Sequence, residues 1–479
     1  MKKILGFLIV LLLTLVLCAC QTPETTSPDL PENGGESQEP SDSGNEPPVL
    51  CENGHTYGDW TETTPAGCFE DGIKSKICSV CNDTITEKIP TLGGHYFGIN
   101  NKCKACGEAY KHGILELELQ GIAYTVVGYD GTTAQVDIPA YYRDVPVMAI
   151  SSGVFRNNTC LTSVSIPSTV MFLDYFVFAK SPNLKTVKLS EGLAHIGRDC
   201  FAQCTGLRNI TIPNSVETIE RGAFRNCSAI KSIVIPDGVT ALGEDTFSWC
   251  TELSDVTLGK SLTSIGDHAF GSCTALKSIQ IPDSVETIGE LAFSGCTVLE
   301  SITLGSGLTS IGKGAFTRCV RLAGIELPDG VTTIEDLTFY SCTNLKSVTF
   351  GNRLISIGEQ AFQDCRKITE LALPNSMKSI GDFAFSGCIS LKTLAIPGGI
   401  TSIGASAFRD CIDLETVEIA KNSRLETIGN YAFYQCTELS NVTYHGSTAR
   451  WMAVSKGFGW DMDTSVVGVT CTDGTVVFN

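Results

Sequence analysis

The sequence predicts a repeat solenoid, in which short coils of chain stack on one another and share one continuous core. Three observations lead to this fold class. A cysteine recurs at steps of 23 residues, at positions 204, 227, 250, 273, 296, 319, 342, 365, 388 and 411. A phenylalanine stands three residues before each of them, from Phe201 to Phe408. A fixed period in this range is typical of solenoids, because a unit of this size cannot bury its apolar face alone.

Each unit is predicted to contain a short strand, a second inward-facing segment and a tight turn. In the unit of residues 276–296, apolar residues alternate around Ile279, which indicates a strand with one buried face. Pro282 ends this strand because it cannot donate a ladder hydrogen bond. Ile288 lies in the second inward segment, and the spacing from Phe293 to Cys296 predicts one short helical or 3₁₀ turn facing the core.

The array of 23-residue units is predicted to span residues 155–445. Phe155 and Phe178 stand in the same phase upstream of the cysteines, with Ser181 at the cysteine position. Downstream, Phe433 follows after one longer step of 25 residues. Stacked units bury each other's apolar residues, so the short strands should run parallel and in register along the array.

The repeated motif I-G-x-x-A-F-x-x-C-x-x-L-x-x-I-x-I-P resembles the leucine-rich repeats of the BspA-like type, which occur in bacterial and protozoan surface proteins. The resemblance covers about residues 155–445. It implies a leucine-rich repeat solenoid with β-rich caps, and a scaffold that binds macromolecules at a cell surface. It also implies that residues 113–154 form the N-terminal cap and residues 446–479 the C-terminal cap, in which Trp451 and Trp460 cover the last core layer.

The first 20 residues indicate export. Lys2 and Lys3 precede an apolar run from Ile4 to Leu17, which is typical of a signal peptide. The stretch Leu17-Cys18-Ala19-Cys20 resembles a bacterial lipobox, and this resemblance implies lipidation at Cys20. Ordinary secretory cleavage after Ala19, or a retained N-terminal helix, remains the alternative. Residues 21–49 carry no lysine or arginine and almost nothing apolar, so we expect a disordered acidic tether there.

Residues 50–112 form a small module rich in cysteine and histidine. In each of the two C-x-x-C pairs, the two thiolates are spaced as tetrahedral zinc coordination requires. The candidate ligands are Cys78, Cys81, Cys103, Cys106, His55 and His95. The spacing resembles small zinc-ribbon-like modules of exported proteins, which makes structural zinc the cofactor hypothesis. Disulfides are the competing hypothesis, because small exported modules often use them, and a catalytic thiol or redox pair is a third.

The cysteines of the array are expected to be small, buried, reduced hydrophobic residues. Cys160, Cys200 and Cys471 stand outside the repeating position, so we expect them to be freer to pair or react. The sequence contains no Ser-His-Asp order, no phosphate-binding glycine loop and no His-Glu-x-x-His motif. No enzyme activity is therefore predicted.

The function predicted from these features is binding or adhesion. The formal net charge of −18 argues against a nucleic-acid partner, because phosphate binding requires a basic face. We expect a protein that is exported, lipid-anchored at the bacterial cell surface, and presents its repeat array to proteins or other surface macromolecules of a host or of bacteria. The alternatives are a structural envelope or spacer protein without a specific ligand, and a glycan receptor.

Overall fold

The computed structural model describes residues 57–64, 72–79, 82, 84–89, 96–97 and 114–478. The predicted signal peptide and tether, with Cys20, lie outside these residues.

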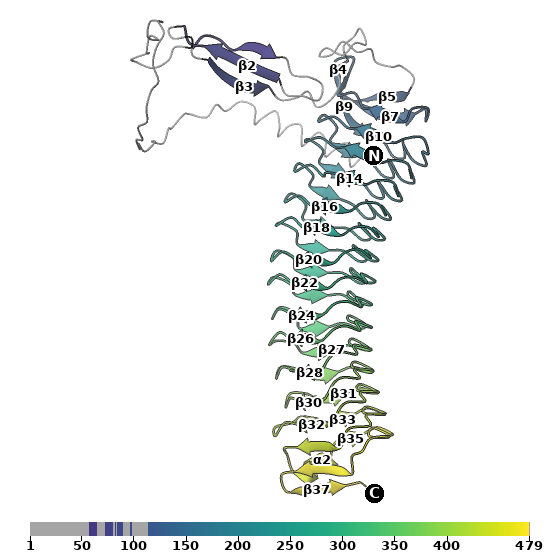
Figure 1. The fold of residues 1–479 in the computed structure, drawn as a ribbon, viewed down its shortest axis with the longest axis vertical. Coiled ribbons are helices and arrows are strands. Elements are labelled where there is room, and N and C mark those ends of the chain that lie inside the picture. Colours follow the sequence, from purple (N-terminus) through teal and green to yellow (C-terminus); the bar gives the residue numbers. More distant parts are fainter. Residues whose placement is uncertain are drawn as a thin grey trace, which may run out of the picture. The chain divides into compact units, whose positions relative to one another are not determined.

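Three antiparallel strands form a small sheet, β1 (Thr61–Thr64), β2 (Gly72–Ile77) and β3 (Thr84–Ile89). From residue 135 onward the chain forms a solenoid of mainly parallel strands (Figure 1), so the predicted fold class is confirmed. Within the described residues, no helix has the length and apolar character needed to cross a membrane.

Two columns of short parallel strands run along the solenoid. The first column contains β7 (Gln135–Asp137), β10 (Ser163–Ser165), β12 (Thr186–Lys188), β14 (Asn209–Ile210), β16 (Ser232–Val234), β18 (Asp255–Thr257), β20 (Ser278–Gln280), β22 (Ser301–Thr303), β24 (Gly324–Glu326), β26 (Ser347–Thr349), β28 (Glu370–Leu371), β30 (Thr393–Ile396), β32 (Thr416–Ile419), β34 (Asn441–Tyr444) and β36 (Gly468–Cys471). Ile279 lies opposite Ile302, and Ser278 lies opposite Ser301, so each residue pairs with its equivalent in the next repeat.

The second column contains β9 (Val145–Ile150), β11 (Phe172–Leu173), β13 (His195–Ile196), β15 (Thr218–Ile219), β17 (Ala241–Leu242), β19 (Ser264–Ile265), β21 (Thr287–Ile288), β23 (Ser310–Ile311), β25 (Thr333–Ile334), β27 (Ser356–Ile357), β29 (Ser379–Ile380), β31 (Ser402–Ile403), β33 (Thr427–Ile428) and β35 (Ser455–Lys456). Both columns extend beyond the predicted array, since β7 and β9 add a coil before it and β35 and β36 add one after it. The solenoid therefore has about 15 turns.

The remaining elements lie at the two ends of the solenoid. At the N-terminal end, β5 (Leu115–Gln120) pairs antiparallel with β6 (Ala123–Tyr129), and β4 (Tyr96–Phe97) and β8 (Tyr141–Tyr142) form a short ladder beside β9. At the C-terminal end, α2 (Thr448–Met452) precedes β35, and β37 (Gly474–Val477) pairs antiparallel with β36. These pairings cover strand edges that an open stack would expose. Trp451 and Trp460 are both buried, in the last layers of the core.

The phenylalanines form one aromatic column inside the solenoid. From Phe155 to Phe433, rings of adjacent coils are nearly parallel, and their centroids are 5.0–5.5 Å apart. Tyr129 packs on the first ring at 5.0 Å, and Trp460 on the last at 6.2 Å with its plane turned by 86°. Offset stacking of this kind adds about 0.5–1.5 kcal/mol per pair beyond the burial of apolar area.

The turn between the second column and the cysteine agrees only in part with the expected short helical or 3₁₀ turn. It contains bonds to the third preceding residue, such as Cys296 N–H to the Phe293 carbonyl at 3.2 Å. Leu291 and Gly295 interrupt this pattern with left-handed φ values of 54° and 73°. Their N–H groups, and that of Phe293, instead donate to carbonyls of the next coil at 2.8–2.9 Å. The turn is thus a third hydrogen-bonded ladder along the stack.

Alternate coils differ where the first-column strand ends. Gly259, Gly305 and Gly351 follow strands in every second coil, and proline occupies the position in the coil before each of them. A Cβ atom on Gly305 would lie 2.2 Å from the carbonyl oxygen of Pro282. Only glycine fits this close approach, because real Cβ atoms do not come so near to a backbone oxygen. The structural repeat in this part of the solenoid is therefore a pair of coils.

Candidate binding surface

The structure describes only one of the six candidate zinc ligands. Cys78 is buried, and its carbonyl accepts a hydrogen bond of 3.0 Å from the Asn82 N–H. The other candidates, Cys81, Cys103, Cys106, His55 and His95, lie outside the described residues. Among the residues that are described, no three histidine, cysteine, aspartate or glutamate side chains form a group that could hold a metal ion. The zinc hypothesis stays a prediction.

The cysteines of the array form a row of buried hydrogen-bond donors. Each Sγ, from Cys204 to Cys436, donates to the phenylalanine carbonyl of the preceding coil at 3.0–3.5 Å. In the coil before Cys204, Ser181 takes the same place, and its Oγ donates to the Phe155 carbonyl at 2.7 Å. The row therefore satisfies carbonyl groups in the core, in addition to filling apolar space.

Burial makes these thiols poor nucleophiles. Desolvation raises the pKa of Cys250, Cys296 and Cys342 to about 12. The thiolate is the reactive form, and burial disfavours it along this row. The expectation for Cys200 is wrong, because it is fully buried beside the row, and burial raises its pKa. It is also wrong for Cys471, which is buried and whose pKa is likewise raised by burial. Cys160 is exposed.

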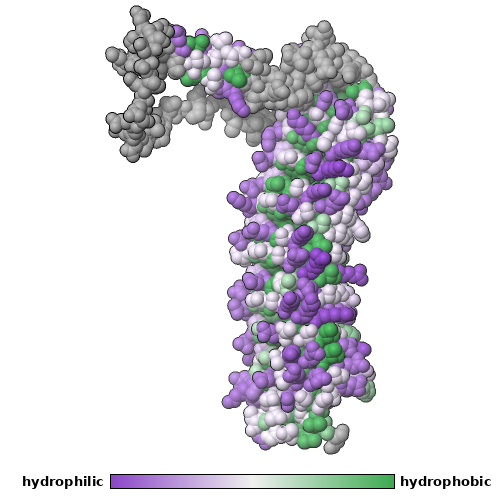
Figure 2. All heavy atoms as spheres, in the orientation of Figure 1, coloured by the Kyte–Doolittle hydropathy of each residue, from purple (hydrophilic) through white to green (hydrophobic). Residues whose placement is uncertain are grey.

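The outward positions of the first column carry the side chains that are available for binding. In most of its strands the central residue is buried and the two flanking residues are exposed, as in β20 and β22. The flanking residues are mainly serine, threonine and charged residues. Figure 2 shows hydrophilic side chains along the length of the solenoid, with hydrophobic ones in small separate groups between them.

An open groove of about 810 Å³ crosses five coils beside the first column. It is lined by Glu300, Val320, Arg321, Ala323, Thr343, Asn344, Arg366, Lys367, Ile389 and Ser390. Most of these residues occupy the first two positions after the cysteine of their coil, where the chain leaves the core and approaches the strand. The groove therefore follows the direction of stacking, and its walls come from successive coils rather than from one loop.

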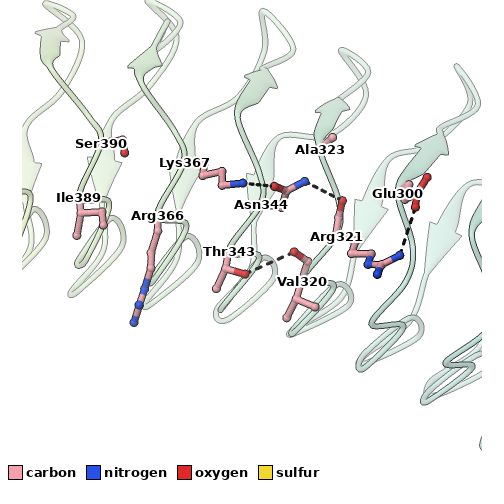
Figure 3. Close-up of a pocket in the computed structure, with 10 residues that line it drawn as sticks. All are labelled: Glu300, Val320, Arg321, Ala323, Thr343, Asn344, Arg366, Lys367, Ile389 and Ser390. Carbon is pink, nitrogen blue, oxygen red and sulfur yellow. Dashed lines mark hydrogen bonds and ion pairs between the residues drawn. The ribbon is translucent and has the colours of Figure 1, made fainter.

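Hydrogen bonds and ion pairs connect the coils across this groove (Figure 3). Arg321 lies 3.6 Å from Glu300 of the preceding coil, and Lys367 donates to the Asn344 side chain at 2.6 Å. Asn344 in turn donates to the Arg321 carbonyl at 3.3 Å. Arg366 forms an ion pair of 3.3 Å with Asp364 in its own coil and points away from the other labelled side chains. The groove combines cationic groups with apolar surface.

The groove residues depart from the repeat consensus. The first position after the cysteine is threonine or serine in five consecutive earlier coils, from Thr205 to Thr297. In the groove the same position holds Val320, Arg366 and Ile389, whereas Thr343 keeps the consensus. Ile412, one coil beyond the groove, also departs from the consensus. Sequence reasoning did not identify this site, although the departures are visible once the coils are aligned on their cysteines. Long side chains at these positions add reach and apolar area without altering the core.

The architecture defines a class: a parallel-stranded leucine-rich repeat solenoid with a surface that varies along a constant core. The sequence matches the model of the BspA type leucine rich repeat region at residues 144–253, 240–369 and 355–450. The chain belongs to this family, as the motif in the sequence indicated. The match is to a repeat scaffold and not to an enzyme family.

Solved structures of bacterial leucine-rich repeat proteins are similar to this chain. A leucine rich cell surface protein from Faecalibacterium prausnitzii A2-165 is 32% identical, with 73% of this chain and 97% of that one covered and a TM-score of 0.47. A leucine-rich repeat protein from Bacteroides ovatus is 26% identical, covering 66% and 95%, with a TM-score of 0.45. The pneumococcal vaccine antigen PcpA is 20% identical, covering 74% and 97%, with a TM-score of 0.44. None of the curated proteins matches the sequence.

Proposed function

We propose that this protein is exported and binds a macromolecule at the cell surface through the groove beside its first strand column. The observation that carries the proposal is the replacement of short hydroxyl side chains by Val320, Arg366 and Ile389 in three of the five coils that line the groove. An extended protein segment suits such a groove, because it can follow successive coils and place apolar and acidic side chains against them. The related cell surface protein supports the proposed location.

The test restores the repeat consensus within the groove. In the triple variant Val320→Thr, Arg366→Thr and Ile389→Thr, each new residue is the one found at that position in other coils, so the core should be unaffected. The matched control places the same large residues elsewhere, as Thr205→Val, Thr251→Arg and Thr274→Ile. Binding of purified full chain to cell-surface and matrix proteins and to whole bacterial cells should be saturable, and lost in the groove variant but not in the control.

The alternative function is a spacer or coat without a specific ligand. It predicts that neither variant changes any binding measured on such a panel, and that the wild-type chain shows no saturable binding. Equal loss in the groove variant and in the control would also argue against the groove, since it would indicate a general effect of surface composition.

We further propose lipidation at Cys20 and structural zinc in the module of residues 50–112, both on the sequence patterns described above. Mass spectrometry of the mature N-terminus tests the first, because a lipid-linked Cys20 would be the first residue. Metal analysis together with a thiol count tests the second. One zinc ion with reduced Cys78, Cys81, Cys103 and Cys106 supports it, whereas metal-free protein with these thiols oxidised identifies disulfides.

A further inference from the structure

Positive charge is concentrated on one side of the early coils. The first-column side of four successive coils comprises residues 157–167, 180–190, 203–213 and 226–236, and it contains five lysines and arginines but no aspartate or glutamate. The intervening residues of the same coils, 168–179, 191–202, 214–225 and 237–248, contain eight acidic residues. This separation stands out in a chain with 52 acidic and 34 basic residues.

The cations on the two sides differ in their partners. On the acidic side, Arg198 and Arg225 both lie within 3.4 Å of Asp199, and Arg221 lies 2.8 Å from Glu244. These three arginines are therefore part of the ion-pair structure of the coils. On the first-column side, Lys185, Arg208 and Lys231 are all exposed, and each precedes a strand of the column. Within the part of the chain that the structure describes, none of these three has an ion-pair partner.

Lys185, Arg208 and Lys231, here named the cation stripe, occupy one register in three successive coils. The Arg208 N–H donates to the Lys185 carbonyl at 3.2 Å, so the backbones of these two residues are adjacent. Neighbouring parallel strands are about 4.8 Å apart, and the stripe therefore places one positive charge per coil along a straight line. Closely spaced like charges repel one another, and a bound polyanion would relieve this repulsion.

The residues beside the cation stripe indicate the chemistry of the partner. Thr186, Asn209 and Ser232 follow the three cations, and all are exposed, short and polar. Protein partners gain most of their binding energy from buried aromatic and other large anchors. Within the four segments defined above, the only exposed large apolar side chain is Val234 and there is no aromatic ring; the exposed Trp249 lies in the next coil. Hydroxyl and amide groups between regularly spaced cations instead suit the hydroxyls and acidic groups of a sugar polymer.

We propose that the cation stripe binds a linear anionic polysaccharide that lies along the direction of stacking. The site is separate from the groove, which begins at Glu300, and the inference does not depend on the partner proposed for that groove. Recognition would come from one cation per coil and from the polar side chains between them. Attraction to a polyanion of this type is weakened by salt, because mobile ions screen exposed charges.

The experiment measures binding of purified full chain to hyaluronate, dextran sulfate and neutral dextran at about 50 mM and about 300 mM salt. The test variant is Lys185→Ser, Arg208→Ser and Lys231→Ser, because Ser254 occupies this position naturally in the next coil. The control, Lys260→Ser, Lys313→Ser and Lys421→Ser, removes three exposed lysines elsewhere and leaves the same net charge. Thermal unfolding verifies that both variants fold.

We expect wild type to bind one or both anionic polysaccharides but not neutral dextran, with weaker binding at high salt. Each exposed charge pair increases the affinity by a factor of about two to five, and the stripe variant loses three of them. It should therefore bind roughly tenfold to a hundredfold more weakly than wild type. The control should retain wild-type affinity. Three results would overturn the proposal. They are equal losses of affinity in both variants, tighter binding to polyglutamate or to duplex DNA than to the polysaccharides, and no binding of the wild type at all. The groove variant should bind these polysaccharides normally.

Discussion

Substitution of Cys296 separates two roles for the cysteine row, as hydrogen-bond donors or only as apolar volume. Its Sγ lies 3.2 Å from the Phe270 carbonyl, which also accepts the Cys273 N–H at 3.2 Å. Cys296→Ala removes one buried atom and one donor. The lost apolar contact should cost about 1 kcal/mol, and the lost hydrogen bond about 0.5–1 kcal/mol more.

Cys296→Ser gives the decisive comparison, because serine retains a donor at this position. Ser181 shows that a hydroxyl fits here, with its Oγ 2.7 Å from the Phe155 carbonyl. If the row donates hydrogen bonds, serine should be less destabilising than alanine by about 0.5–1 kcal/mol. If only apolar volume matters, serine should be worse than alanine, since a buried hydroxyl without a partner costs about 1–3 kcal/mol.

Native-state hydrogen exchange, followed by mass spectrometry, is the suitable assay. Solenoids often unfold in parts, so a single denaturation midpoint does not report the local free energy. Peptides from residues 270–319 would report the opening free energy of the affected coils, with the exposed Cys160→Ala as a neutral control. A serine variant that exchanges faster than the alanine variant would refute the hydrogen-bonding role of the row.

Three further predictions concern the same core. Thiol reagents at pH 8 should label Cys160 in the native array but leave Cys200 and the cysteine row unlabelled until the protein unfolds; native labelling of the row would contradict its burial. Folding raises the pKa of Cys250 from 9.0 to about 12. The free energy of unfolding should therefore be constant below about pH 9 and fall as the pH rises toward 12. The loss is up to about 1.4 kcal/mol per pH unit for each such thiol. Alkaline titration by circular dichroism measures this, and a melting temperature that stays constant from pH 9 to 11 would exclude it. Gly305→Ala should destabilise its coil by about 2 kcal/mol or more, because its Cβ would meet a backbone oxygen. Gly324→Ala should be nearly neutral, because its Cβ comes within 3.0 Å only of the movable Ser347 side chain. Native-state hydrogen exchange of the peptides around each site measures both changes, and equal opening free energies for the two variants would refute the steric argument.

The stacked architecture could be predicted from the sequence because each coil repeats the same apolar positions. Phe293, Cys296 and Ile279 are buried as the period indicated, and the first-column strands lie in the predicted register. The periodicity determines which side chains face inward, since any other register would expose a whole set of apolar residues to water. The same reasoning explains why the span of the array could be predicted without any knowledge of the turns.

The details of the turns and ends could not be predicted, because they depend on contacts between coils. The left-handed positions are occupied by residues as different as Leu291, His268 and Asp245, so no common residue type marks them. Cys200 looked irregular in the sequence, yet it faces the core one turn before Cys204. The groove was missed for a similar reason: its residues become neighbours only when successive coils are placed in register.

The ladders between coils also explain why so much negative charge is compatible with this fold. Asp237, Asp283 and Asp329 each accept a backbone N–H from the next coil at 2.7–2.8 Å. The pKa of Asp283 is lowered mainly by the hydrogen bond from the Ser306 backbone N–H, and further by the one from the Ser306 side chain. These carboxylates satisfy backbone donors of the stack, so their presence does not indicate a cationic partner.

Many outward hydroxyl groups have a similar structural role. The Oγ1 atoms of Thr263, Thr309 and Thr401 each donate to a carbonyl of the preceding coil at 2.9–3.1 Å. Side chains with such partners contribute to the stack and are less available to a ligand. The cations of the stripe have no ion-pair partner in the described structure. In the groove, Arg366 pairs only within its own coil, and Val320 and Ile389 carry apolar side chains. Other groove residues, Arg321, Asn344 and Lys367, do bond to neighbouring coils. Binding specificity in this solenoid should therefore reside in outward residues that form no ladder, which gives a physical criterion for selecting positions to mutate.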